Sequence, residues 1–149
     1  MREIKKEIEV LEVIYKNILM LKESIISVIK LKELDSNLVS DLNEILILYK
    51  KIMQAVAGML RTRKKNVKTL TIGEKFVNYM GIKLNIDSSN EISDIAKILM
   101  QDISFRTTSI TKSVSEYSKI SKTIINLEKR ITFSCQKCNK KLEKYVKTT

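Results

Sequence analysis

The sequence predicts an all-α protein built from long helices. Apolar residues recur at spacings of three and four over most of the chain, which is the spacing of one helix face. Residues that mark turns are scarce, with three glycines and no proline among 149 residues. We therefore expect a single helical domain, an antiparallel helical hairpin followed by a long third helix in a three-helix, coiled-coil-like bundle.

The hairpin is predicted from two amphipathic segments. Residues 2–34 form the first helix, and its apolar stripe is wide enough to contact two neighbours. Residues 37–65 form the second helix, whose apolar residues follow an unbroken heptad-like seam. Asp35 and Ser36 between them are capping residues, and so short a connection makes the two helices antiparallel.

The third predicted helix is the longest and covers residues 91–132. Its heptad-like seam is the candidate interaction surface and comprises Ile103, Ile110, Tyr117, Ile120, Ile124, Leu127 and Ile131. A straight helix of this length would measure about 60 Å and extend beyond the hairpin. Exposed apolar rows on the extension predict a homo-oligomer or packing on another helical protein.

The middle of this helix carries an unusual density of hydroxyl side chains. Ten of the twenty residues from 104 to 123 are Ser or Thr. These residues are mediocre helix formers because their side chains compete for backbone hydrogen bonds. The stretch is open to three interpretations, a hinge, a polar contact surface or a solvated flank.

Two segments fall outside the predicted helices. Residues 66–90 form an irregular connection that we expect to pack on the bundle. Residues 133–149 form a short basic C-terminal tail, so that the helical bundle itself spans residues 1–132.

The net charge of +11 is concentrated in two places. Residues 61–86 and residues 129–149 each contain seven Lys or Arg against one acidic residue. Such clusters can hold nucleic-acid phosphates without reading bases, although cations also favour helix C-termini, and the clusters can equally reflect a lysine-rich composition. Aromatic residues for stacking on bases are few. The candidate anion-binding residues are Arg61, Arg63, Lys64, Lys65, Lys68, Lys129, Arg130, Lys140 and Lys141.

Cys135 and Cys138 form the sharpest local motif, a C-x-x-C pair. Two thiolates at this spacing can occupy half of a zinc tetrahedron. The chain has no histidine and no second cysteine pair, so a complete zinc site would have to be shared between two chains. The alternatives are a redox pair or plain cysteines. No other cofactor is expected.

Catalysis is not expected from this sequence. Histidine is absent, phosphate-binding glycine motifs are absent, and the carboxylates are spread over helix surfaces beside lysines. We expect no small-molecule substrate.

The charged N-terminus has no apolar segment typical of a signal peptide, and the longest apolar run, residues 45–49, is too short to span a bilayer. We therefore expect a cytoplasmic, intracellular protein.

Three functional hypotheses follow. The leading one is a non-catalytic helical assembly or adaptor protein that acts through protein–protein contacts and self-association through the third-helix seam. The second is a nucleic-acid-binding or packaging protein that uses both basic clusters without sequence-specific readout. The third is peripheral docking to an anionic membrane, which we consider less well supported than the other two.

Overall fold

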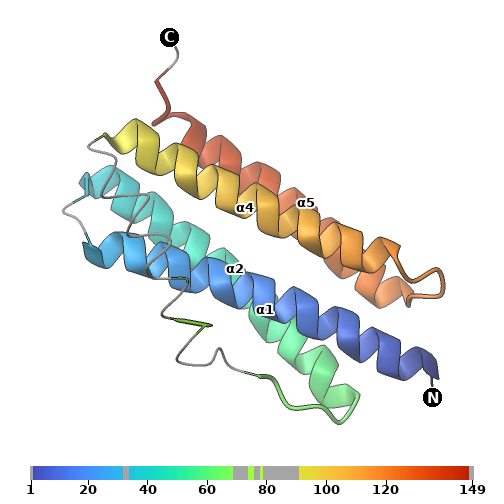
Figure 1. Ribbon diagram of the computed structural model, residues 1–149. Helices are drawn as coiled ribbons and strands as arrows, with labels where there is room; N and C mark the ends of the chain where they lie inside the picture. The colour runs from blue at the N-terminus through green and yellow to red at the C-terminus, as the bar shows by residue number, and fades with distance from the viewer. Residues whose placement is uncertain (1, 32–33, 69–73, 76–77, 79–90, 148–149) are drawn as a thin grey trace.

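The computed structural model describes residues 2–31, 34–68, 74–75, 78 and 91–147. These residues form long helices and, within the described ranges, no strand. The helices are α1 (Arg2–Leu31), α2 (Ser36–Thr62), α4 (Ile92–Ser115) and α5 (Lys122–Glu143), shown in Figure 1. The prediction of an all-α fold is confirmed.

The predicted single helix over residues 91–132 is wrong. The chain reverses direction at residues 116–121, so that α4 and α5 form a second antiparallel hairpin (Figure 1). The N–H groups of Ile124 and Ile125 both donate to the Ser121 carbonyl at 3.1 Å, which starts α5. The reversal lies inside the Ser/Thr-rich stretch, where side chains compete for the backbone hydrogen bonds of a helix.

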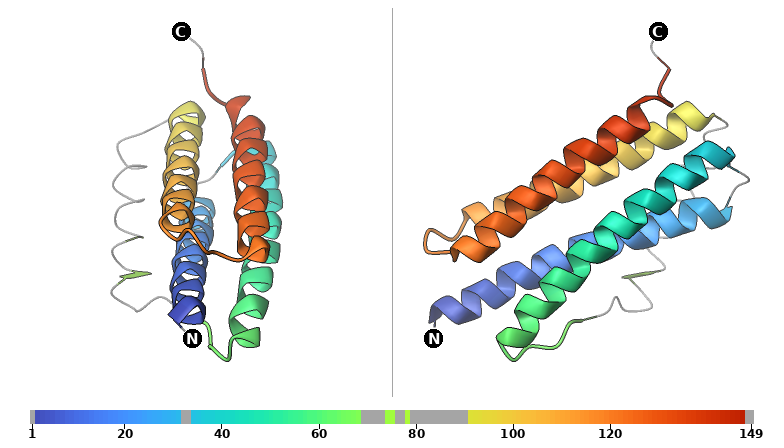
Figure 2. Two further views of the ribbon diagram at one scale, coloured as in Figure 1. Left: turned by 90° about the vertical axis from the view of Figure 1, so that its right-hand side faces the viewer. Right: turned by 180° about the vertical axis from the view of Figure 1, so that it is seen from behind.

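The two hairpins stack to give a four-helix bundle rather than a three-helix one. Helix α1 packs against α2 and α4, whereas α5 packs against α4 and α2 (Figure 2). The predicted two-sided packing of the first helix is thus confirmed. Neighbouring helices run antiparallel. The interface between α2 and α5 is the least extensive of the four, which leaves this side of the bundle less tightly closed.

The connection from α2 to α4 must run the length of the bundle, because α2 ends and α4 begins at opposite ends (Figure 1). Its described residues contact successive turns of α1. Lys68 pairs with Glu12 at 3.3 Å, and the Asn78 amide donates to the Ser24 hydroxyl at 3.2 Å. Glu74 and Lys75 are helical. The remaining part of the predicted irregular connection lies outside the described residues.

The core runs through all four helices. It includes Ile18 of α1, Tyr49 of α2, Ile103 of α4 and Ile131 of α5, which are essentially inaccessible to solvent. Helix α5 continues past residue 132 to Glu143, and buries the two cysteines and Leu142 in this core. Residues 133–143 are therefore part of the bundle rather than of a separate tail.

Largely buried carboxylates join the two hairpins at both ends of the bundle. Near the N-terminus, Glu7 accepts hydrogen bonds from the Arg63 guanidinium at 3.1 Å and from the Ser121 N–H at 2.9 Å. At the other end, Asp41 accepts from the Lys144 ammonium at 2.8 Å and from the Tyr145 hydroxyl. Burial disfavours the Asp41 carboxylate, but these partners outweigh it and lower the pKa of Asp41. Each hairpin is thus fixed to the other at two points.

Among the helices described, none is apolar over a stretch long enough to cross a lipid bilayer.

Candidate binding surface

The predicted interaction seam lies inside the molecule. Its seven members are buried or half-buried against other helices of the same chain: Ile103, Ile110, Ile124, Leu127 and Ile131 are buried, and Tyr117 and Ile120 are half-buried in the 116–121 turn. Self-association through this seam requires a helix that extends beyond the hairpin. Because the chain turns back instead, the seam serves as the internal core.

The basic cluster at the end of α2 is partly neutralised. Arg63 pairs with Glu7, and Lys68 pairs with Glu12. Lys64 has a positive φ of 58°, the left-handed conformation that often follows a helix C-terminus. Arg61 and Lys64 are exposed, and Lys65 is half-buried. In this cluster, Arg63 and Lys68 therefore form ion pairs, Lys64 follows the helix end, and only part of the positive charge is left exposed and unpaired among the described residues.

Helix α5 presents cations that remain unpaired. Lys129, Arg130 and Lys140 are exposed and have no carboxylate partner in the described part of the chain. Lys141 differs, because it pairs with Glu44 and lies 3.8 Å from Asp41. The exposed cations of this helix and the aromatic side chain among them are here called the basic face, which comprises Lys122, Lys129, Arg130, Phe133, Lys137 and Lys140; the other exposed residues of α5 are Thr123, Asn126, Gln136 and Glu143.

Phe133 is the apolar centre of the basic face. Its neighbours two positions away, Ile131 and Cys135, are buried, so Phe133 lies on the opposite side of the helix and is 66% exposed. Three cations flank it at helical spacing, at positions 129, 130 and 137. Phe105 of α4 is equally exposed at 68%; the residues at positions 101, 108 and 109 around it are uncharged, and the Arg106 guanidinium, 6.0 Å from its ring centroid, is paired with Asp102. Phe105 therefore provides a matched control for Phe133.

A groove between α2 and α5 lies beside the basic face and has a volume of about 270 Å³. Its apolar residues include Ile47 of α2, whose side chain is 56% exposed although it is apolar. One end holds the Glu44–Lys141 ion pair, whereas Lys51 and Lys137 have no carboxylate partner among the described residues. The groove is lined by Glu44, Ile45, Ile47, Leu48, Lys51, Lys137, Cys138 and Lys141.

No family model, curated protein or solved structure matches this chain.

The C-x-x-C pair lies on the buried side of α5. Cys135 and Cys138 are free thiols inside the bundle, and burial raises the pKa of the Cys138 thiol to about 11. The thiolate is the form that binds zinc and reacts with disulfides. In the described residues, no three Cys, Asp or Glu side chains are placed to hold a metal ion. The inter-chain zinc site thus gains no support from the position of these thiols.

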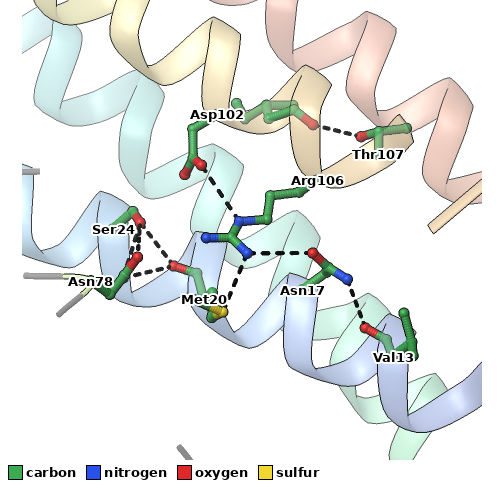
Figure 3. Close-up of polar contacts among 9 residues, drawn as sticks. Val13, Asn17, Met20, Ser24, Asn78, Asp102, Arg106 and Thr107 are labelled. Carbon is green, nitrogen blue, oxygen red and sulfur yellow. Dashed lines mark hydrogen bonds and ion pairs between the residues drawn. The ribbon is translucent and has the colours of Figure 1, made fainter. Parts of the chain in front are cut away.

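A buried polar cluster joins α1 to α4 (Figure 3). Arg106 lies 3.5 Å from the Asp102 carboxylate and donates to the Asn17 amide oxygen at 3.4 Å. Ser24 and Asn78 continue the cluster towards the connection. Burial raises the pKa of Asp102 despite the nearby Arg106 and Ser24 side chains. The cluster joins α1 to α4 through the Arg106–Asn17 hydrogen bond, while Asp102 Oδ2 and Arg106 Nε are buried without a hydrogen-bond partner among the described residues.

Sequence reasoning missed part of this surface. The sequence predicts a basic tail at Phe133 and Lys137 and places Ile47 and Lys51 in the second helix without a binding role. A signal for the first pair was present, because Phe133 and the cations around it follow helical spacing if the last helix continues past residue 132. Nothing in the sequence alone placed α2 beside α5.

Proposed function

We propose that this protein is a non-catalytic adaptor that acts through protein–protein contacts and holds an acidic partner protein against the basic face of α5. The observation that carries the proposal is the row of unpaired cations on this face. Elsewhere in the described residues, several cations such as Arg63, Lys68 and Lys144 are used in ion pairs between helices, and other exposed lysines are unpaired without being gathered around an exposed aromatic side chain as on this face.

The row is long enough to guide a macromolecular partner. From Lys122 to Lys140 the helix rises by about 27 Å. Among the exposed residues of α5, the only acidic one is Glu143, which lies one turn beyond Lys140 at the end of the helix. Like charges arranged along one rigid element attract an oppositely charged partner and orient it during encounter. The electrostatic part of such binding should weaken as salt is added.

Exposed apolar side chains favour a protein as the partner. Phe133 projects from the centre of the basic face, and Ile47 projects beside it at the groove. Protein interfaces combine an apolar or aromatic centre with a charged rim, and aromatic residues are enriched among the contacts that dominate affinity. Phe133 with its surrounding cations supplies this combination.

Nucleic acid is the second candidate. The same cations could contact phosphates, and Phe133 could stack on one base. The face offers a single aromatic residue, however, and the cluster at residues 61–68 is partly consumed by ion pairs. This candidate predicts binding dominated by charge, with a steep dependence on salt.

Charge reversal tests the proposal. The variant combines Lys129→Glu, Arg130→Glu and Lys137→Glu, and its matched control combines Lys50→Glu, Lys97→Glu and Lys112→Glu at exposed positions outside the basic face. The probes are a fluorescent acidic amphipathic peptide and a single-stranded oligonucleotide. We expect the face variant to bind the peptide at least about tenfold more weakly, because three favourable charges become repulsive.

The control variant separates a local surface from net charge. It carries the same change in charge and should retain peptide binding within about twofold. Equal weakening of both variants would contradict the proposal. Tight binding of the oligonucleotide with no binding of the peptide, lost in the face variant, would instead support the second candidate.

A further inference from the structure

We infer that the groove between α2 and α5 seats an acidic amphipathic helix supplied by the partner protein. This inference rests on the proposed function and names the segment of the partner that is bound. It is carried by three features of the groove, which are an uncovered apolar wall, unpaired cations along one end, and an opposite end that is already neutralised.

The apolar wall is formed by adjacent residues of α2. Ile47 is 56% exposed and Leu48 is half-buried, while Ile45 and Cys138 below them are buried. Helices α2 and α5 pack less extensively than the other three neighbouring pairs, and Ile47 remains exposed beside the described residues of the groove. A helix that places apolar side chains in such a groove shields Ile47 and Leu48 from water, which is favourable.

The charges select an acidic occupant. Lys51 from α2 and Lys137 from α5 line the groove from its two sides, and neither has a carboxylate partner in the described residues. Arg130 lies two helical turns before Lys137 on α5 and extends the positive charge. At the other end, Glu44 is balanced by Lys141. A basic helix would meet like charges, whereas Glu or Asp residues flanking the apolar stripe would be paired.

The dimensions fit a short helical segment. The part of α2 that lines the groove, from Glu44 to Lys51, rises by about 10 Å. This length matches about two helical turns, so two apolar side chains at positions i and i+4 of the partner could contact Ile47 and Leu48. A peptide of about 14 residues covers the groove with one further turn at each end.

The test uses the full chain and a synthetic peptide as the probe. The peptide is helical, about 14 residues long, with Leu at i and i+4 spacing and Glu along both edges. A second peptide of the same composition has its leucines scattered around the helix. We expect the amphipathic peptide to bind at least about tenfold more tightly than the scattered one, because only the first can place its leucines in the groove.

Variants locate the contact. Ile47→Glu and Lys51→Glu change exposed groove residues, so circular dichroism should show an unchanged helix content. Each variant should bind the amphipathic peptide about tenfold or more weakly than the unmodified protein does. The matched controls are Phe105→Glu, at another exposed apolar position, on α4, and Lys50→Glu, at the lysine that precedes Lys51 on α2. Both controls should bind within about twofold of the unmodified protein.

The outcomes separate this inference from the proposed function. If the groove variants bind the peptide normally but reversal of the basic face abolishes binding, the groove is not the site and the proposed function stands. If the groove variants and their controls lose affinity equally, or if both peptides bind equally, the inference is overturned. If the peptide does not bind at all, both proposals fall.

Discussion

Replacement of Arg106 by methionine is expected to lower the free energy of unfolding by about 3–5 kcal/mol at neutral pH. The Arg106 and Asp102 side chains are only 16% and 18% exposed. Removal of the guanidinium leaves the Asp102 carboxylate buried without a cation and also removes a hydrogen bond to Asn17. Urea denaturation followed by circular dichroism measures the change.

The loss of stability in the Arg106→Met variant should be larger at neutral pH than at acidic pH. Burial already raises the pKa of Asp102, and removal of Arg106 should raise it further. An acid with a raised pKa in the folded state binds its proton more tightly there, so stability falls as the pH rises above the unfolded-state pKa. The Arg106→Met variant should therefore be less impaired at about pH 4 than at about pH 7.

A double substitution provides the control. Asp102→Leu combined with Arg106→Met replaces the buried pair by apolar side chains, which is often close to neutral for stability. The double variant should therefore recover most of the free energy of unfolding that Arg106→Met loses. A change below about 1 kcal/mol for Arg106→Met alone would contradict the burial of this ion pair.

Replacement of Ile131 by alanine is expected to lower the free energy of unfolding by about 2–4 kcal/mol. Ile131 is fully buried where α5 meets the rest of the bundle, so the substitution leaves a cavity. Ile47→Ala on α2 is the control at a position that is largely exposed, and it should change stability by less than about 0.5 kcal/mol. Chemical denaturation of both variants gives the comparison.

The same experiment distinguishes an internal seam from one between chains. If Ile131 and its neighbours pack within one chain, the denaturation midpoint should not depend on protein concentration. A midpoint that falls on dilution would show that the seam joins separate molecules, contrary to the four-helix structure.

The N-terminal half of the fold could be predicted from local pattern. The predicted helices at 2–34 and 37–65 correspond to α1 at Arg2–Leu31 and α2 at Ser36–Thr62. Asp35 acts as the N-cap that the sequence indicated, since its carboxylate accepts from the N–H groups of Asn37 and Leu38. Capping and periodicity are local properties, and they were sufficient here.

The reversal at residues 116–121 could not be found by periodicity. Tyr117 and Ile120 are half-buried within the turn, so the apolar spacing continues across it as it would along one helix. No glycine or proline marks the turn. The density of Ser and Thr was the only signal, and it fitted a hinge, a contact surface or a solvated flank equally well.

The binding surface could not be predicted from the sequence, because it depends on which cations pair with residues distant in the chain. The sequence identified cations of the right type, but Arg63 meets Glu7 across 56 residues and Lys141 meets Glu44 across 97. Only the fold shows that these cations are used internally while Lys129, Arg130 and Lys137 are not. The groove likewise exists only because α5 returns beside α2.

Chemical-shift mapping tests the central claim most directly. The isotope-labelled full chain is titrated with the acidic amphipathic peptide, and backbone amide shifts are followed by NMR. We predict that the largest changes fall on the groove and the adjoining basic face, at residues 44–51 of α2 and 130–141 of α5, with none around Phe105. Shifts concentrated on α1 or α4, or no shifts at saturating peptide, would contradict the proposed binding surface.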